Sequence, residues 1–134
     1  MLRYLLDTNI VISALRRSSV VLDARLASEA GSMAVSAITA TELYFGAERS
    51  AARSVNLRAV EEFFSLIKLL DFACPAAGHA ASIRADLTQR GLILGPYDVL
   101  IAGQARSAGL CLITNNRREF DRVDGLRVED WTTG

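Results

Sequence analysis

This sequence of 134 residues is poor in cysteine, histidine and lysine. Its two cysteines, Cys74 and Cys111, lie far apart and form no C-x-x-C or Cys/His pattern, so they neither build a zinc site nor demand a disulfide. His79 is the only histidine and has no nucleophile elbow beside it, which removes support for a serine hydrolase. G-x-G-x-x-G and P-loop spacings are missing too, so nucleotide binding is unsupported.

Long apolar runs and an excess of either charge are also missing. No run approaches the roughly 18 residues that span a bilayer, and the acid at position 7 comes too early for a secretory signal. The 15 basic residues balance the 15 acidic ones, and this zero net charge excludes an obviously basic protein that coats nucleic acids. We therefore expect a cytoplasmic protein without a membrane segment.

What the sequence does contain is enough apolar material for a substantial core. Hydrophobic residues make up 51% of the chain, which is the opposite of the balance found in disordered proteins. A chain of this length fits one compact domain, and no repeat, low-complexity stretch or linker divides it. We expect a single domain over residues 1–134.

Short apolar runs alternate with segments of helical periodicity along the chain. The runs at 4–6, 33–36, 67–70, 110–113 and about 126–129 predict strands. Helical spacing follows position 7, runs over about 20–30, begins near 39, and continues over 54–66, 75–90, 95–109 and a turn at 117–120. This alternation predicts an α/β fold with a mainly parallel sheet of roughly five strands.

Acidic and amide side chains stand where these elements meet. Asp7 directly follows the first strand, and Asn116 and Glu119 follow the fourth, while Glu42 and Asp98 begin helices. Ligands of open parallel sheets bind outside the carboxyl ends of the strands, so these groups can converge at one edge. Ionised carboxylates in one cleft repel one another unless a cation lies between them, and oxygen ligands select Mg²⁺ or Mn²⁺.

Each acid also has a purely structural interpretation. Asp7 could serve only as a helix N-cap, and Glu42 lies three residues after Thr39, the spacing of a capping box. Asp98 stands among apolar residues, where an acid needs a partner or a solvent pocket. The metal hypothesis therefore depends on the acids taken together.

Two other domains with acids at strand ends fit less well. Haloacid dehalogenase-type phosphatases need a second aspartate two residues after the first, where this chain has Asn9. Receiver domains need a lysine at the carboxyl end of a strand, whereas Lys68 lies early in its strand.

Four ordered motifs resemble the signatures of PIN-domain ribonucleases. They are Leu5-Leu6-Asp7-Thr8-Asn9, the segment 36–43 with Glu42, the segment 95–102 with Asp98, and the segment 114–120 with Glu119. Within this family the sequence is most similar to the VapC toxins of toxin–antitoxin operons, and the tail 123–131 resembles them as well. The resemblance implies a three-layer α/β/α sandwich and a Mg²⁺-dependent endoribonuclease, with Mn²⁺ as a substitute. It also implies a homodimer that a VapB-type antitoxin inhibits.

The resemblance also assigns roles to individual residues. Asp7, Glu42 and Asp98 match the three invariant acids and become the expected metal ligands, and Glu119 becomes a fourth catalytic acid. Many PIN domains carry aspartate where this chain has Asn116, so which of Asn116 and Glu119 fills the fourth position stays open. Four groups would orient the carboxylates: Thr8, Asn9, Thr114 and Asn116.

The resemblance leaves several alternatives open. The number of metals, the general base and the RNA target are not readable, although a transfer RNA such as initiator tRNA is our leading expectation. The competing hypothesis is a catalytically inert PIN-like module that binds RNA or a protein partner.

Overall fold

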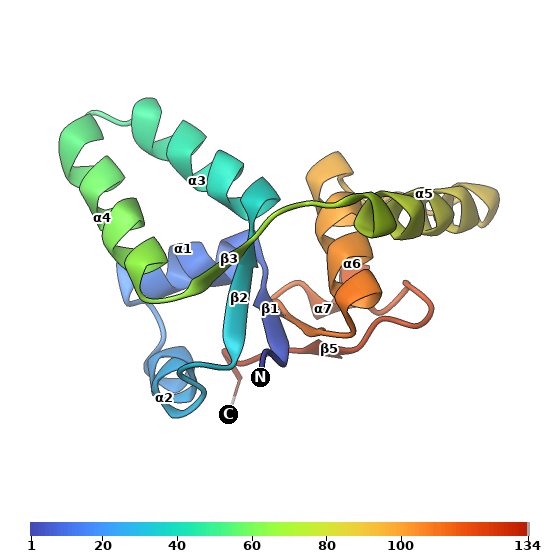
Figure 1. Cartoon of the computed structure of the whole chain (residues 1–134), viewed down its shortest axis with the longest axis horizontal. Helices are drawn as coiled ribbons and strands as arrows, with labels where there is room; N and C mark the ends of the chain where they lie inside the picture. The colour runs from blue at the N-terminus through green and yellow to red at the C-terminus, as the bar shows by residue number, and fades with distance from the viewer. Residues whose placement is uncertain (134) are drawn as a thin grey trace.

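The computed structural model describes residues 1–133, and its centre is one five-stranded sheet. The strands are β1 (Tyr4–Leu6), β2 (Met33–Ser36), β3 (Lys68–Leu70), β4 (Cys111–Ile113) and β5 (Val128–Glu129). They lie in the order β3-β2-β1-β4-β5, and every neighbouring pair is parallel (Figure 1). The expected parallel sheet is confirmed. The expected single domain ended at Gly134, which lies outside the described residues.

Helices cover both faces of this sheet (Figure 1). They are α1 (Thr8–Arg16), α2 (Val20–Ser28), α3 (Ala37–Glu48), α4 (Arg53–Ser65), α5 (Cys74–Gln89), α6 (Pro96–Ala108) and α7 (Arg117–Phe120). Helices α1 to α4 supply one core cluster, and α5 to α7 supply the other. The fold is therefore the three-layer α/β/α sandwich that the family resemblance implied.

The alternation of side chains along β1 explains the two cores. Leu5 points into the core beneath α5 and α6, whereas Tyr4 and Leu6 point into the core beneath α1 to α4. All three side chains are buried, with exposed fractions of 4% or less. A strand buried on both faces reads as a continuous apolar run, which is why this strand was evident from the sequence.

Helix α3 begins earlier than the sequence suggested. Ser36 is its N-cap, and the Ser36 hydroxyl oxygen accepts a hydrogen bond from the N–H of Ile38 at 2.9 Å. The capping box between Thr39 and Glu42 is therefore wrong, because Thr39 already lies inside the helix and Glu42 lies in its second turn. Ser36 is itself a good capping residue, so β2 passes into α3 without a loop.

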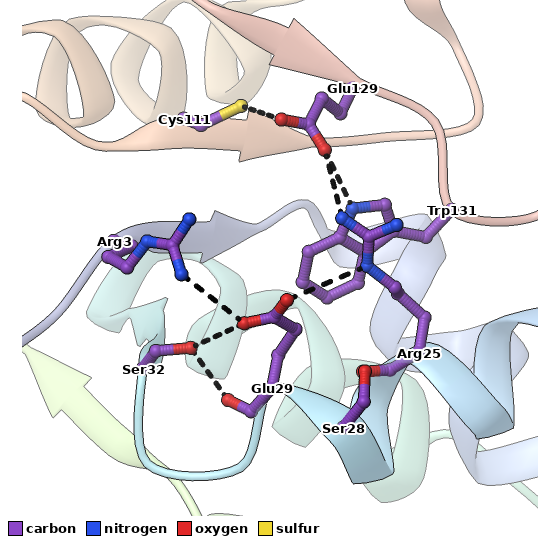
Figure 2. Close-up of polar contacts among 8 residues, drawn as sticks. All are labelled: Arg3, Arg25, Ser28, Glu29, Ser32, Cys111, Glu129 and Trp131. Atoms are coloured by element: carbon purple, nitrogen blue, oxygen red, sulfur yellow. Dashed lines mark hydrogen bonds and ion pairs between the residues drawn. The ribbon is translucent and has the colours of Figure 1, made fainter.

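The side chains around Trp131 attach the C-terminal segment to β1 and α2. The ring of Trp131 packs edge-on against Tyr4, with ring centroids 4.7 Å apart. The Trp131 N–H donates to Glu129 at 3.0 Å, and the guanidinium of Arg25 lies 4.9 Å from the Trp131 ring (Figure 2). These contacts hold β5 and α2 together at the edge of the sheet.

Two expected absences can be compared with the structure. Cys74 and Cys111 are both free thiols. Within residues 1–133, no helix combines the length and the apolar composition that crossing a bilayer requires.

Candidate active site

The order of the strands brings the carboxyl ends of β1 and β4 side by side in the sheet. The chain leaves β1 into α1 on one face of the sheet, and it leaves β4 towards α7 on the other. Such a reversal of direction between neighbouring parallel strands opens the sheet at their carboxyl ends, where α/β proteins bind ligands. Asp7 follows β1 and Thr114 follows β4, so both residues lie at this end of the sheet, where both are buried.

Asp7 is held rigidly at this position. Its side chain is buried, with an exposed fraction of 2%. Oδ1 accepts a hydrogen bond from the N–H of Thr8 at 2.7 Å, and Oδ2 accepts one from the hydroxyl of Thr114 at 2.8 Å. Each carboxylate oxygen can accept a further bond. Asp7 is therefore both the N-cap of α1 and an available ligand, which joins the two interpretations that its position allowed.

The pKa of Asp7 is raised above its ordinary value. Burial is the main cause, because it disfavours the charged carboxylate, and the negative charge of Glu42 acts in the same direction. The hydrogen bonds from Thr114 and Thr8 oppose this effect. A bound cation would favour the charged form, as the hydrogen bonds do.

Glu42 reaches the same region from the second turn of α3. The hydroxyl of Thr8 donates to Glu42 Oε1 at 2.7 Å, and the hydroxyls of Thr8 and Thr39 lie 3.0 Å apart. Thr39 is fully buried and Thr8 nearly so. Two buried hydroxyls therefore connect α1 with α3 and orient the Glu42 carboxylate next to Asp7.

Asp98 approaches from the first turn of α6. Gly95 is the N-cap of this helix, and a β-carbon on Gly95 would lie 3.1 Å from Asp98 Oδ2. Burial raises the pKa of Asp98 to about 6, with further contributions from the negative charges of Asp7, Glu42 and Glu119. The charges of Asp7, Glu42 and Glu119 therefore act on Asp98, and the metal site expected from these four acids stays a prediction.

Glu119 differs from the other three acids because it is ion-paired. Its Oε2 contacts the guanidinium of Arg122, three residues further along the chain. In the part of the chain that the structure describes, no such partner accompanies Asp7, Glu42 or Asp98. Glu119 is also more accessible than Asp7, with 41% of its side chain exposed.

The four expected supporting residues have different surroundings. Thr8 and Thr114 contact Glu42 and Asp7, as described above. Asn116 acts through its backbone, because its N–H donates to the Thr114 hydroxyl oxygen at 2.9 Å. Asn9 is exposed in the first turn of α1. Its expected role in orienting a carboxylate stays a prediction.

The donor set of this site fits a hard divalent cation. All four acids supply oxygen atoms, and their mutual repulsion disfavours the charged forms unless a cation is present. Within residues 1–133, no three acidic, imidazole or thiol groups are grouped closely enough to enclose one ion. Mg²⁺ commonly binds through one or two carboxylates and keeps several waters, so it does not require a closed cage.

Two residues of this site escaped the sequence analysis. Thr39 was considered only as a helix cap, although its hydroxyl meets that of Thr8. Arg122 was overlooked among the many arginines. Its spacing of three residues from Glu119, next to a helical turn, was the signal that could have revealed it.

Known proteins share both the sequence and the shape of this chain. Residues 4–126, which include all four acids, match the family model of the PIN domain. A tRNA(fMet)-specific endonuclease VapC from Shigella flexneri is 46% identical over 132 residues, covering 98% of this chain and 100% of the relative. A ribonuclease VapC2 from Haemophilus influenzae is 45% identical over 131 residues, with coverages of 98% and 99%.

The structural similarity covers the chain to the same extent. DNA-bound VapBC from Salmonella typhimurium contains a chain that superimposes with a TM-score of 0.94. The two chains are 44% identical, and the match covers 98% of this chain and 99% of the other.

Proposed function

Since the chain belongs to the PIN-domain family, we propose that it is a VapC-type toxin, a Mg²⁺-dependent endoribonuclease whose activity a cognate antitoxin inhibits. The observation that carries this proposal is a group of four carboxylates whose charges act on one another near the ends of β1 and β4. The negative charges of the other three acids raise the pKa of Asp98. Asp7 is buried, and two hydrogen bonds orient its carboxylate oxygens. The proposed reaction is hydrolysis of an RNA phosphodiester bond in the cytoplasm.

We assign the following roles to the acids. Asp7 and Asp98 are the proposed direct metal ligands, and Glu42 would be a third ligand or would orient the water that attacks the phosphate. Glu119 is the proposed fourth acid, and 41% of its side chain is exposed. A divalent cation held there supplies an activated water nucleophile and neutralises charge on the phosphate.

The chain's own groups prepare the site for this chemistry. Thr114 and the N–H of Thr8 hold both oxygens of Asp7 in place, so little reorganisation is needed when the phosphate arrives. Thr8 in turn orients Glu42. Burial and the charges of the other acids raise the pKa of Asp98 to about 6, and a cation bound by Asp98 would lower this pKa and keep the carboxylate ionised.

We propose a transfer RNA as the substrate, with initiator tRNA first. The relative from Shigella flexneri, named for its action on tRNA(fMet), covers nearly all of this chain at 46% identity. Single-stranded segments of such an RNA, for example a loop, leave their phosphates free to approach the four carboxylates.

The proposed function is tested by replacing the acids one at a time. Purified Asp7→Asn and Asp98→Asn proteins should lose Mg²⁺-dependent cleavage of initiator tRNA and still melt cooperatively. Asp23→Asn is the matched control, because Asp23 lies in α2 and pairs with Arg17 at 3.5 Å. Sequencing of RNA 5′ ends after induced expression of the wild type and Asp7→Asn locates the cleavage site. Undiminished cleavage by the two variants contradicts the assignment.

Metal binding distinguishes an enzyme from an inert module. Calorimetric titration of the wild type with Mn²⁺ or Mg²⁺ should detect binding that Asp98→Asn weakens. No measurable binding, together with no cleavage, would favour the inert RNA- or partner-binding module.

We propose in addition that the chain forms a homodimer through the outer surface of α5 and α6. An apolar groove of about 730 Å³ lies between these helices, and beside it Ile93 is 83% exposed. Exposed apolar surface of this kind marks protein–protein contacts. Sedimentation velocity should give a dimer for the wild type and a shift towards monomer for Ile93→Asp.

A further inference from the structure

The half-buried side chain of Arg122 makes three polar contacts. Its Nη2 pairs with Oε2 of Glu119 and also donates to the backbone oxygen of Ile93 at 2.9 Å. Its Nε donates to the backbone oxygen of Glu119 at 3.2 Å. The guanidinium therefore links α7 to the loop between α5 and α6.

A second arginine supports the same connection. Arg90, the C-cap of α5, donates to the backbone oxygen of Arg122 at 2.5 Å. Residues 91–94, which follow Arg90, lead to Gly95, the N-cap of the helix that carries Asp98. The loop before Asp98 and the turn after Glu119 are thus fastened to each other at two points.

We propose that Arg122 is a positioning residue, which holds the Glu119 carboxylate and the loop before Asp98 in the relative arrangement that the active site needs. This inference rests on the function proposed above. Arg122 is itself anchored on two backbone carbonyls, so its position does not depend on the carboxylate that it directs. It engages Oε2 of Glu119, and in the described part of the chain Oε1 is left for a ligand.

The alternative role for Arg122 is that its positive charge competes with the metal ion for the Glu119 carboxylate. An arginine that merely neutralised Glu119 would lower the attraction for a divalent cation, and its removal would tighten metal binding. A positioning arginine has the opposite effect, because its removal lets the carboxylate and the loop move away. Outer residues that orient ligands typically contribute about 10-fold to 100-fold in metal affinity or activity.

The experiment compares Arg122→Ala with Arg122→Lys and Arg90→Ala in the full-length protein. For Arg122→Ala we expect about a 10-fold lower kcat for tRNA cleavage, a KM close to that of the wild type, and weaker Mn²⁺ binding by calorimetry. Lysine can pair with Glu119 but cannot reproduce the guanidinium fork, so Arg122→Lys should recover part of both losses. Arg90→Ala, which keeps the pair with Glu119, should lose much less.

A second comparison tests whether Arg122 acts through Glu119. Mn²⁺ affinity is measured for Glu119→Gln alone and together with Arg122→Ala. The second substitution should weaken binding by less than about 2-fold in that background, because residues that act as a unit are not additive. The half-exposed ion pair contributes little to stability, so the melting temperatures should change little.

The outcomes separate this inference from the proposed function. If the wild type binds Mn²⁺ and cleaves tRNA, but Arg122→Ala leaves both unchanged or tightens Mn²⁺ binding, the positioning role is overturned and the proposed function stands. If the wild type neither binds metal nor cleaves RNA, the proposed function fails together with its positioning residue. Equal losses for Arg122→Ala and Arg90→Ala would indicate a general effect on the loop, and this result would also overturn the assignment.

Discussion

The hydroxyl of Thr114 donates a hydrogen bond to the buried carboxylate of Asp7 at 2.8 Å, although the two residues are separated by 107 positions in the chain. β1 and β4 are neighbours in the sheet, so the residues that follow them meet at its carboxyl edge. The Asp7 carboxylate is therefore oriented by a residue that follows β4, a strand much later in the chain.

Replacing Thr114 with valine should damage both stability and activity. The substitution removes the donor to Asp7 Oδ2 and the acceptor for the N–H of Asn116, while the volume stays similar. A buried group left without its partner costs about 1–3 kcal/mol in the free energy of unfolding. Urea denaturation should show this loss, and the tRNA cleavage rate should fall. Thr114→Ser keeps the hydroxyl and serves as the control; an equal loss in both variants would argue against the hydrogen bond as the cause.

The pKa of Asp98 predicts how the stability of the metal-free protein depends on pH. Because the folded-state pKa is raised from 3.8 to about 6, the folded protein binds more protons than the unfolded chain between these values. The melting temperature should therefore fall as the pH rises from about 4 to about 6. Asp98→Asn cannot ionise, so it should lack this decrease and be more stable than the wild type at pH 7 without metal.

Addition of Mg²⁺ should reverse that relationship. The cation favours the charged carboxylates, so at pH 7 it should raise the melting temperature of the wild type more than that of Asp98→Asn. Protons and Mg²⁺ compete for the Asp98 carboxylate, so cleavage should require more Mg²⁺ as the pH falls through about 6, the pKa of Asp98 in the metal-free protein. Identical melting profiles of the two chelator-treated proteins across this range would contradict the assigned pKa.

The crossing of α5 and α6 depends on one glycine. A β-carbon at Gly103 would lie 2.6 Å from the backbone nitrogen of Ala80, which is closer than real atoms approach. We expect Gly103→Ala to lower the free energy of unfolding by about 1–3 kcal/mol, as overpacked cores do. Gly78→Ala in α5 is the matched control, because nothing lies within 4 Å of its β-carbon position. Alanine there should stabilise the helix by about 0.5–1 kcal/mol, and chemical denaturation measures both changes.

The side chains around Trp131 should determine whether β5 stays attached. Trp131→Ala removes a buried ring, which has an exposed fraction of 3% and packs against Tyr4. Large aromatic truncations in a core cost about 3–5 kcal/mol. Trp131→Phe keeps a ring but loses the hydrogen bond to Glu129, which is worth about 1 kcal/mol.

Detachment of this segment should also reach the active site. The N–H of Thr114 donates to the backbone oxygen of Glu129 at 3.0 Å, so β5 helps to hold the residue that directs Asp7. Hydrogen exchange should therefore show faster exchange of the Thr114 amide in Trp131→Ala than in Trp131→Phe. Unchanged protection of this amide in the alanine variant would rule out the connection.

Much of this architecture was predictable because its signals are local. The apolar run at 4–6 and the Gly109 at the end of α6 act through neighbouring residues, and both were read correctly from the sequence. The parallel arrangement followed from alternating elements, and the geometry of parallel strands placed the residues after β1 and β4 at the same end of the sheet. The sequence also carried the four motifs on which the family resemblance depends.

Where two capping signals compete, local patterns were insufficient. Ser36 and Thr39 both have the chemistry of an N-cap, and only the position of β2 decided that Ser36 caps α3 and Thr39 meets Thr8 in the interior. The Glu42 carboxylate consequently accepts a hydrogen bond from Thr8, 34 positions away, and not from the first turn of its own helix.

By itself, then, the sequence determined the elements, the parallel fold and the identity of the acids. The tertiary structure alone decided which hydroxyl directs each carboxylate and which of 14 arginines meets Glu119. The physical reason is distance along the chain: strands and helices form from contacts between near neighbours, whereas β1, β4 and the loop before α6 come together only when the core closes.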